Sequence, residues 1–272
     1  MAAPVIASAG SVPPIPLSTL IRTKNHAGMI GQVIAAAGAL GGEIVVIDSG
    51  STDGTIEIAE NAGARVVSNP WPGFGPQRRF GEEQCGHDMI FSLDADEIVT
   101  ADMAREVRAH FVPGPPPRLM VVRKAMIMPH HDRPPPWGFA HEQVLIYDRR
   151  VARTSPNPNW DKLDITVKDK PVTIRAPLWH YSLEDWHQAV GKANYIAKLA
   201  ADTMDKPRSR FGLLVRLVIE FPVTFLKFYF LRRYFLAGVE GFNMAVVTAF
   251  GRWLRIAMML ERHDWGGIRR KI

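Results

Sequence analysis

The sequence has a single cysteine, Cys85, in 272 residues, so no disulfide can form within the chain. This indicates a reducing compartment. No basic residue precedes Arg22, whereas a secretory signal begins with a charged segment. We therefore expect residues 1–16, which are rich in proline, to form a loose N-terminal leader. No stretch reaches the roughly 18 uncharged apolar residues of a membrane-spanning helix. These absences favour a cytoplasmic protein.

Charge is distributed unevenly along the chain. The net charge is +6. From Lys206 to the end there are 13 Lys or Arg and 4 Asp or Glu, so this part carries +9 and the remainder −3. Such a gradient predicts an anionic partner for the C-terminal part, either nucleic acid or a membrane surface.

Residues 206–272 combine this basic charge with many large apolar side chains. The segment is rich in Phe, Leu, Arg and Lys, and Pro222 is expected to interrupt the helical pattern. One interpretation is a helical subdomain packed on the rest of the protein. The other, which we favour, is a set of helices lying in a bilayer interface with their basic groups at the lipid phosphates. Nucleic acid is the least favoured partner, because no nucleic-acid-binding motif accompanies the charge.

The first hundred residues alternate between strand and helix patterns. β-branched runs predict strands, and segments with spaced aliphatic residues that end in glycine predict helices. Ser51, Thr52 or Asp53 is the expected N-cap of the second helix. The order predicts an α/β fold with a mainly parallel sheet. The expected strands are 17–23, 43–48, 64–69 and 88–96, with helices at 29–41, 51–63 and 75–86 between them.

Carboxylates follow two of these strands directly. Asp48 closes "EIVVID", and Asp94 and Asp96 close "MIFSLDAD". Ligands bind beyond the C-terminal ends of parallel strands, and paired carboxylates there suit Mg²⁺ or Mn²⁺ beside a diphosphate. The simpler alternative is that Asp94 and Asp96 cap a turn or the next helix.

The combination of motifs resembles the family 2 glycosyltransferases, which have the GT-A fold. "VVIDSGSTDGT" (45–55), "NPWPGFGPQRR" (69–79) and "FSLDADE" (91–97) carry the family resemblance. Two later segments, 178–201 and 225–250, resemble the branch that adds glucose in β-1,4 linkage to lipopolysaccharide core. The resemblance implies a catalytic domain over 17–205, followed by a membrane-associating region over 206–272.

The resemblance also implies roles for single residues around the nucleotide-sugar donor. Thr23 matches the uracil-side wall of the nucleotide pocket. Asp48 matches the acid that contacts the base, with Gly50 and Ser51 in the adjoining turn. Two further positions, Gln77 and Arg78, match residues that line the donor site, and a guanidinium suits phosphate oxygens.

Metal and base positions follow in the same way. Asp94 and Asp96 match the family's DxD pair, the first nearer the ribose and the second on the metal, and His180 matches a histidine close to the metal or diphosphate. Asp161 in "NWDKLD" is the first candidate for the catalytic base and Glu142 in "FAHEQV" the second. The base region departs from the family pattern, as does His26, which stands where the family has an acid.

Together these features predict an inverting, metal-dependent hexosyltransferase that uses Mg²⁺ or Mn²⁺. The expected donor is a nucleotide diphosphate sugar, with a UDP-sugar and glucose favoured, and the expected acceptor is a lipid-linked glycan. The expected location is peripheral, on the inner face of the cytoplasmic membrane, against an anionic surface and without nucleic acid. The alternative is a degenerate, non-catalytic member of the family that serves as a membrane scaffold.

Overall fold

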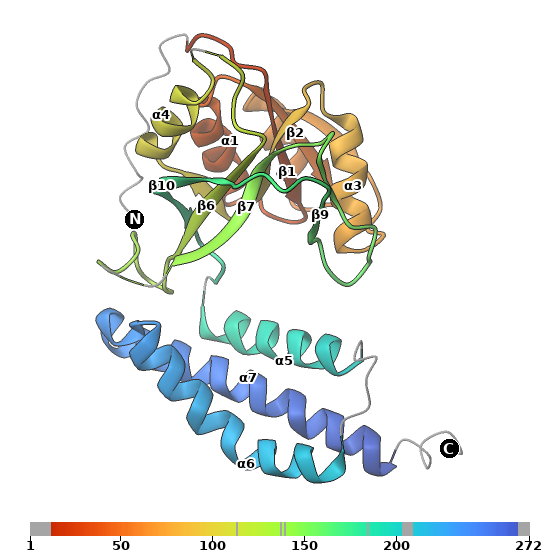
Figure 1. Ribbon diagram of the computed structural model, residues 1–272, viewed down its shortest axis with the longest axis vertical. Coiled ribbons are helices and arrows are strands. Elements are labelled where there is room, and N and C mark those ends of the chain that lie inside the picture. The colour runs from red at the N-terminus through yellow and green to blue at the C-terminus, as the bar shows by residue number, and fades with distance from the viewer. Residues whose placement is uncertain are drawn as a thin grey trace. The chain divides into compact units, whose positions relative to one another are not determined.

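The apolar runs of the N-terminal half form the centre of one sheet. In the computed structural model, which describes residues 12–112, 114–136, 138, 140–183, 185–202 and 209–265, β1 (Leu17–Thr23) pairs in parallel with both β2 (Glu43–Asp48) and β4 (Met89–Asp94). Most side chains of these strands are buried on both faces, which is why apolar residues dominate them. The predicted parallel α/β arrangement is confirmed (Figure 1).

The complete sheet has eight strands in the order β3-β2-β1-β4-β7-β6-β10-β5. β7 runs antiparallel to its neighbours β4 and β6, and β5 runs antiparallel to β10. A separate two-stranded sheet pairs β8 with β9. The remaining strands are β3 (Arg65–Ser68), β5 (Glu97–Val99), β6 (Leu119–Met126), β7 (Ala140–Asp148), β8 (Ala152–Thr154), β9 (Leu163–Ile165) and β10 (Val172–His180).

Helices cover both faces of this sheet. The apolar faces of α1 (Ile30–Gly38) and α4 (Ala101–Ala109) belong to one core cluster, whereas α3 (Phe74–Gln84) contributes Phe80 to another. α2 (Thr55–Asn61) begins after Gly54, so the predicted N-cap at residues 51–53 is wrong. Gly54 takes the cap position because it adopts a left-handed backbone with φ +79°, which costs glycine little.

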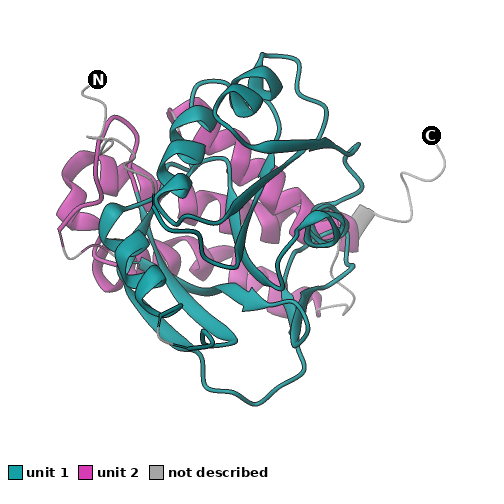
Figure 2. Ribbon diagram, turned by 90° about the horizontal axis from the view of Figure 1, so that it is seen from above, with its two compact units in different colours: residues 1–126, 140–182 teal, residues 127–139, 183–272 magenta. Residues whose placement is uncertain are grey.

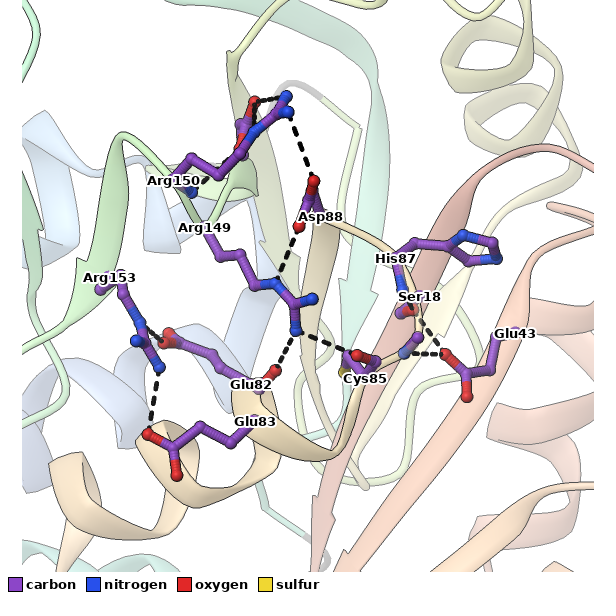
Figure 3. A network of polar contacts seen from close by, with 12 residues as sticks. Ser18, Glu43, Glu82, Glu83, Cys85, His87, Asp88, Arg149, Arg150 and Arg153 are labelled. Carbon is purple, nitrogen blue, oxygen red and sulfur yellow. Dashed lines mark hydrogen bonds and ion pairs between the residues drawn. The ribbon is translucent and has the colours of Figure 1, made fainter.

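A polar network fixes the C-terminal end of α3 (Figure 3). Arg149 donates to the carbonyl oxygens of Glu82 and Cys85, at 2.8 and 2.9 Å, and so satisfies acceptors that a helix end leaves open. The fully buried carboxylate of Glu82 accepts hydrogen bonds from Tyr147 and Thr154. These contacts hold α3, which carries Gln77 and Arg78, in a fixed position against the strands.

The chain divides into two compact units, residues 1–126 with 140–182 and residues 127–139 with 183–272 (Figure 2). We expected the division between residues 205 and 206, but α5 (Trp186–Asp202) packs with the C-terminal helices. Small residues allow this approach: a Cβ atom on Gly251 would lie 3.0 Å from that of Ala193. Of the expected leader, residues 1–11 lie outside the described residues, and Ile15 is buried beside β1.

The second unit is built from α5, α6 (Arg210–Leu226) and α7 (Gly238–Trp265), with a π-helical turn η1 (Lys227–Leu231) and a 3₁₀ turn η2 (Tyr234–Ala237) between α6 and α7. The expected interruption at Pro222 is wrong, because α6 continues through it. A proline removes one backbone donor from a helix, and packing of α6 along α7 sustains the helix around that gap.

This helical unit leaves many large apolar side chains exposed. They occur along α6, at the two turns and on the first half of α7. Within the described residues, the segment Tyr234–His263 is long and apolar enough to cross a membrane, although a third of the apolar window is buried inside the protein. The segment contains charged residues such as Glu240 and Arg252, so it is not an uncharged apolar stretch. The most exposed large apolar side chains of this helical unit, at 55–78%, are those of Phe211, Val218, Val223, Phe230, Leu231 and Val239.

Candidate active site

Three parallel strands end at the same edge of the sheet and bring the predicted site residues there. β1, β2 and β4 end at Thr23, Asp48 and Asp94. Thr23 is the register partner of Asp48, and Arg22 that of Asp94. This is the edge at which open α/β sheets bind ligands.

Asp48 is buried and organises the turn that follows β2. Its Oδ2 accepts hydrogen bonds from the backbone N–H groups of Gly50 and Ser51, at 2.8 and 2.9 Å, and its Oδ1 accepts one from the Ser51 hydroxyl. Gly50 has φ +90°, a conformation that favours glycine. The neighbouring Thr23 Oγ1 is buried and has no hydrogen-bond partner among the described residues. The turn is therefore preorganised, with an unused hydroxyl beside it.

Gln77 is fully buried in α3 and connects two loops at this edge. Its Nε2 donates to the Ser49 hydroxyl at 3.0 Å and to the Asn69 carbonyl at 3.1 Å. Its Oε1 accepts from Asn69 Nδ2 at 2.6 Å. Because its amide is used in this way, Gln77 positions the loops after β2 and β3.

Two arginines and two carboxylates form an ion-pair cluster beside this turn. Arg78 donates from Nη2 to Asp94 Oδ1 at 2.8 Å and from Nε to Asp161 Oδ2 at 2.7 Å. Arg22 approaches the same two oxygen atoms at 2.9 and 3.3 Å. Arg78 also donates to the Ser92 hydroxyl. The structure thus brings three of the predicted residues, Arg78, Asp94 and Asp161, into direct contact.

Opposite charges determine the ionisation of this cluster. Burial raises the pKa of Asp94, but Arg78 and Arg22 lower it more, so the pKa lies well below its usual range. The pKa of Asp161 is lowered by the same two arginines, again against burial. Two cations balance two anions here, so the cluster has no spare positive charge for a diphosphate. A bound diphosphate needs either a metal ion or a rearrangement of these ion pairs.

The second acid of the motif, Asp96, pairs with His180 at the end of β10. Asp96 Oδ2 lies 3.3 Å from His180 Nε2, and Asp96 Oδ1 is buried without a hydrogen-bond partner among the described residues. Burial lowers the pKa of His180, but Asp96 and Glu97 raise it more. Within the part of the chain that the structure describes, no group of three His, Cys, Asp or Glu residues could hold a metal ion.

The donor set of Asp96 and His180 fits a divalent metal ion. An oxygen and a neutral imidazole nitrogen both bind Mn²⁺, and phosphate oxygens or water complete such a site. The orphaned Oδ1 of Asp96 is an acceptor that lacks its partner. Asp94, the third predicted metal residue, has Oδ1 engaged with Arg22 and Arg78. The two carboxylates of the motif therefore have different surroundings.

Glu142, the second candidate for the base, lies apart from the ion-pair cluster. It is on β7 with its side chain 60% exposed, and its Oε1 is 3.7 Å from Arg123 Nε. Asp161 is the more buried of the two candidates, at 27% exposure of its side chain. Of these two candidates, only Asp161 has ion pairs with Arg22 and Arg78 among the described residues.

Sequence reasoning assigned no role to three charged residues at this edge. Arg22 stands over the rings of Trp71 and Phe74, at 5.6 and 5.3 Å from their centroids. Lys124 Nζ is 2.5 Å from the fully buried Glu97, which also accepts the Asp94 backbone N–H. An arginine within the apolar run "TLIRT", two residues before a loop, was the available signal for Arg22.

Comparison with known proteins identifies the class of enzyme. A family model described as glycosyl transferase family 2 matches residues 18–150. An uncharacterized glycosyltransferase of Rickettsia bellii is 32% identical over 90% of this chain and 86% of its own length. The chain belongs to glycosyl transferase family 2 and is a transferase, and its sheet is the GT-A type that its motifs predicted.

One further relative has a more specific name, and one solved structure matches only part of the chain. The lipopolysaccharide core biosynthesis glycosyltransferase LpsC of Rhizobium meliloti is 27% identical over 93% of this chain and 94% of its own. Among solved structures, glucosyl-3-phosphoglycerate synthase from Mycobacterium tuberculosis, in complex with Mn²⁺, UDP and phosphoglyceric acid, is 26% identical with a TM-score of 0.34. That match covers 41% of this chain and 43% of the synthase.

Proposed function

We propose that this transferase moves a hexose, with glucose favoured, from a nucleotide diphosphate sugar to a lipid-linked glycan with inversion at the sugar. The observation that carries the proposal is the juxtaposition of Asp96 with His180 beside the ion pairs of Arg78 with Asp94. A UDP-sugar is the favoured donor, because Asp48 and Thr23 offer polar groups where the family binds uracil. The similarity to LpsC favours a lipopolysaccharide core acceptor.

Asp96 and His180 are the residues that would hold Mg²⁺ or Mn²⁺. A divalent ion held there would supply positive charge to stabilise the leaving diphosphate. Arg78 and Arg22 offer guanidinium groups of matching geometry to phosphate oxygens. Asp94, held by both arginines, keeps them at the end of β4 before the donor arrives.

Asp161 is the proposed base for the acceptor hydroxyl, with Glu142 as the alternative. In the structure both arginines hold Asp161 as a weakly basic carboxylate. A donor diphosphate that draws the arginines toward itself raises the pKa of Asp161 and makes it a better proton acceptor. This order of events couples donor binding to activation of the acceptor.

Attachment to the inner face of the cytoplasmic membrane is the proposed role of the helical unit. Exposed Phe, Leu and Val side chains of α6, η1, η2 and α7 accompany the basic charge of this region. That combination suits insertion into the interface of an anionic bilayer. A lipid-linked acceptor would then meet the enzyme at the membrane surface.

A transfer assay tests the proposal. Purified full-length protein is incubated with UDP- and GDP-linked glucose, galactose and mannose, with Mn²⁺ and a lipopolysaccharide core acceptor, and release of the nucleotide is measured. We expect turnover with one UDP-sugar in the wild type, loss of turnover in Asp96→Asn, and normal turnover in Asp102→Asn, an exposed acid on α4. No turnover of any donor, together with retained vesicle binding, would favour the scaffold alternative.

A further inference from the structure

One carboxylate of the helical unit is surrounded by three arginines. Glu220 lies on α6 with its side chain 10% exposed. Arg216, one turn earlier on α6, donates to Glu220 Oε2 from Nε at 3.0 Å and from Nη2 at 2.6 Å. From α7, Arg255 Nη2 lies 3.3 Å and Arg252 Nη1 3.9 Å from Glu220 Oε1. The four side chains form a cluster on two helices of the same compact unit.

This cluster has more positive charge than its carboxylate neutralises. Three guanidinium groups face one carboxylate, which leaves an excess of two charges. The two α7 arginines share a single oxygen, so Oε1 of Glu220 satisfies only part of their donors. Arg252 is the most exposed of the three, with 48% of its side chain accessible.

One donor of Arg255 lacks an acceptor. Its Nε is buried and has no hydrogen-bond partner among the described residues, although a buried donor without a partner is costly. Burial lowers the pKa of Arg255, and the positive charge of Arg252 lowers it further, by more than Glu220 raises it. The local potential at Arg255 is therefore positive, and an anion with several acceptor oxygens is the group that it lacks.

We propose that Arg216, Arg252 and Arg255 form a binding site for a phosphate group, with Glu220 holding the three guanidinium groups in place. A phosphate offers several acceptor oxygens and one or two negative charges, which match the free donors and the excess charge. Exposed Ile219 and Val223, three residues after Arg216 and Glu220, neighbour this cluster on α6. These apolar neighbours suit a phosphate that belongs to a lipid headgroup, and a free phosphate shares the same chemistry.

The site extends the membrane attachment proposed above and rests on it where the phosphate comes from lipid. Its test uses binding alone. Sedimentation with phosphatidylcholine vesicles, with and without phosphatidic acid, measures the lipid form, and calorimetry with inorganic phosphate measures the free form. The variants are Arg252→Gln and Glu220→Gln, and the matched control is Lys198→Gln, which removes one exposed positive charge from α5 of the same unit.

The two variants are expected to change affinity in opposite directions. Arg252→Gln weakens binding to phosphatidic acid vesicles about fivefold, because one basic group near the phosphate is lost. Glu220→Gln strengthens binding by about the same factor, because it removes the competing anion. The control changes binding by less than about twofold, as expected for a charge outside the site. If inorganic phosphate gives this order and vesicles do not, the ligand is a free phosphate.

Several results would overturn the site. If Arg252→Gln and Lys198→Gln weaken phosphate binding equally, the effect comes from net charge and not from a specific site. Weaker binding by a folded Glu220→Gln protein, checked by circular dichroism, assigns a purely structural role to the cluster. Absence of binding to both phosphate forms also refutes it. If the variants show the expected order of phosphate affinities but sugar transfer fails, only the proposed activity is refuted. If sugar transfer is normal but the variants do not show that order of affinities, only this phosphate site is refuted.

Discussion

Breaking the ion pair between Arg78 and Asp161 tests the geometry of the candidate active site. The perturbation is a double-mutant cycle of Arg78→Gln and Asp161→Asn, because the amides keep the size of the side chains while removing charge. Arg78 Nε lies 2.7 Å from Asp161 Oδ2, and the two side chains are 7% and 27% exposed. Both groups are thus shielded enough from water for their attraction to be measurable.

The magnitude follows from charge separation and from the neighbouring arginine. Two unit charges about 4 Å apart attract by about 4 kcal/mol at an effective dielectric constant of about 20. Arg22 reaches the same Asp161 oxygen at 3.3 Å and replaces part of that attraction when Arg78 is changed. We therefore expect a coupling free energy of about 2 kcal/mol, within the range for contacting residues.

Urea unfolding followed by hydrogen exchange in α3 and β4 measures this coupling. Exchange is read in these elements because a chain of two compact units need not unfold in one step. The control cycle pairs Arg78→Gln with Asp102→Asn, an exposed acid on α4, and its effects are expected to add. Additivity within about 0.5 kcal/mol in the Asp161 cycle would refute the proposed ion-pair cluster.

Three further predictions concern packing, pH and metal. Gly75→Ala places a Cβ atom 2.1 Å from the Ser155 carbonyl oxygen and is expected to destabilise the protein by about 1–3 kcal/mol in urea unfolding. The matched change Gly191→Ala meets no atom within 4 Å and is expected to stabilise α5 by about 0.5–1 kcal/mol; equal effects would contradict the close packing at Gly75. The pKa of Asp161 lies below its ordinary value of 3.8, so its stabilisation is present above that pH and is lost as the pH falls through the lower pKa of the folded state. The wild type should therefore lose more stability than Asp161→Asn when unfolding is compared at pH 6 and about pH 3, and parallel losses would refute this. Removing divalent metal with EDTA should abolish sugar transfer, and added Mn²⁺ should restore it in the wild type but not in Asp96→Asn; full activity in EDTA would contradict a metal held by Asp96.

The pH dependence of transfer distinguishes the two candidates for the base. Asp161→Asn is expected to lower kcat by a factor of about 100 or more and to remove the acidic limb of the kcat profile. Glu142→Gln is expected to leave both unchanged, since Glu142 is exposed and outside the cluster. The reverse pattern would assign the base to Glu142.

Local patterns were sufficient to predict the α/β sheet and its acidic edge. The runs "TLIRT", "EIVVID" and "MIFSLD" are too apolar for exposed strands, and parallel strands necessarily bring their C-terminal ends together. Asp48 and Asp94 were therefore expected at one edge, and the structure places them there. Family resemblance predicted Asp96 on the metal and His180 near the metal or diphosphate, and the antiparallel register of β5 and β10 brings these two residues close.

Long-range and packing effects were beyond the sequence patterns. The contact of Asp161 with Arg78 joins residues 83 positions apart, and no periodicity encodes such a pairing. Pro222 was expected to interrupt the helical pattern, but packing of α6 along α7 outweighs one missing hydrogen bond. Similarly, α5 joins the C-terminal helices because its small residues fit α7, a feature of shape that composition does not reveal.

Calorimetric binding of UDP to the full-length protein, with and without Mn²⁺, is the most direct test of the proposed donor site. The proposal predicts Mn²⁺-dependent binding to the wild type that is lost in Asp96→Asn and in His180→Gln and retained in Asp102→Asn. If the affinity for UDP is the same with and without Mn²⁺ and is unchanged in both site variants, the proposed metal-assisted site at the ends of β4 and β10 is contradicted.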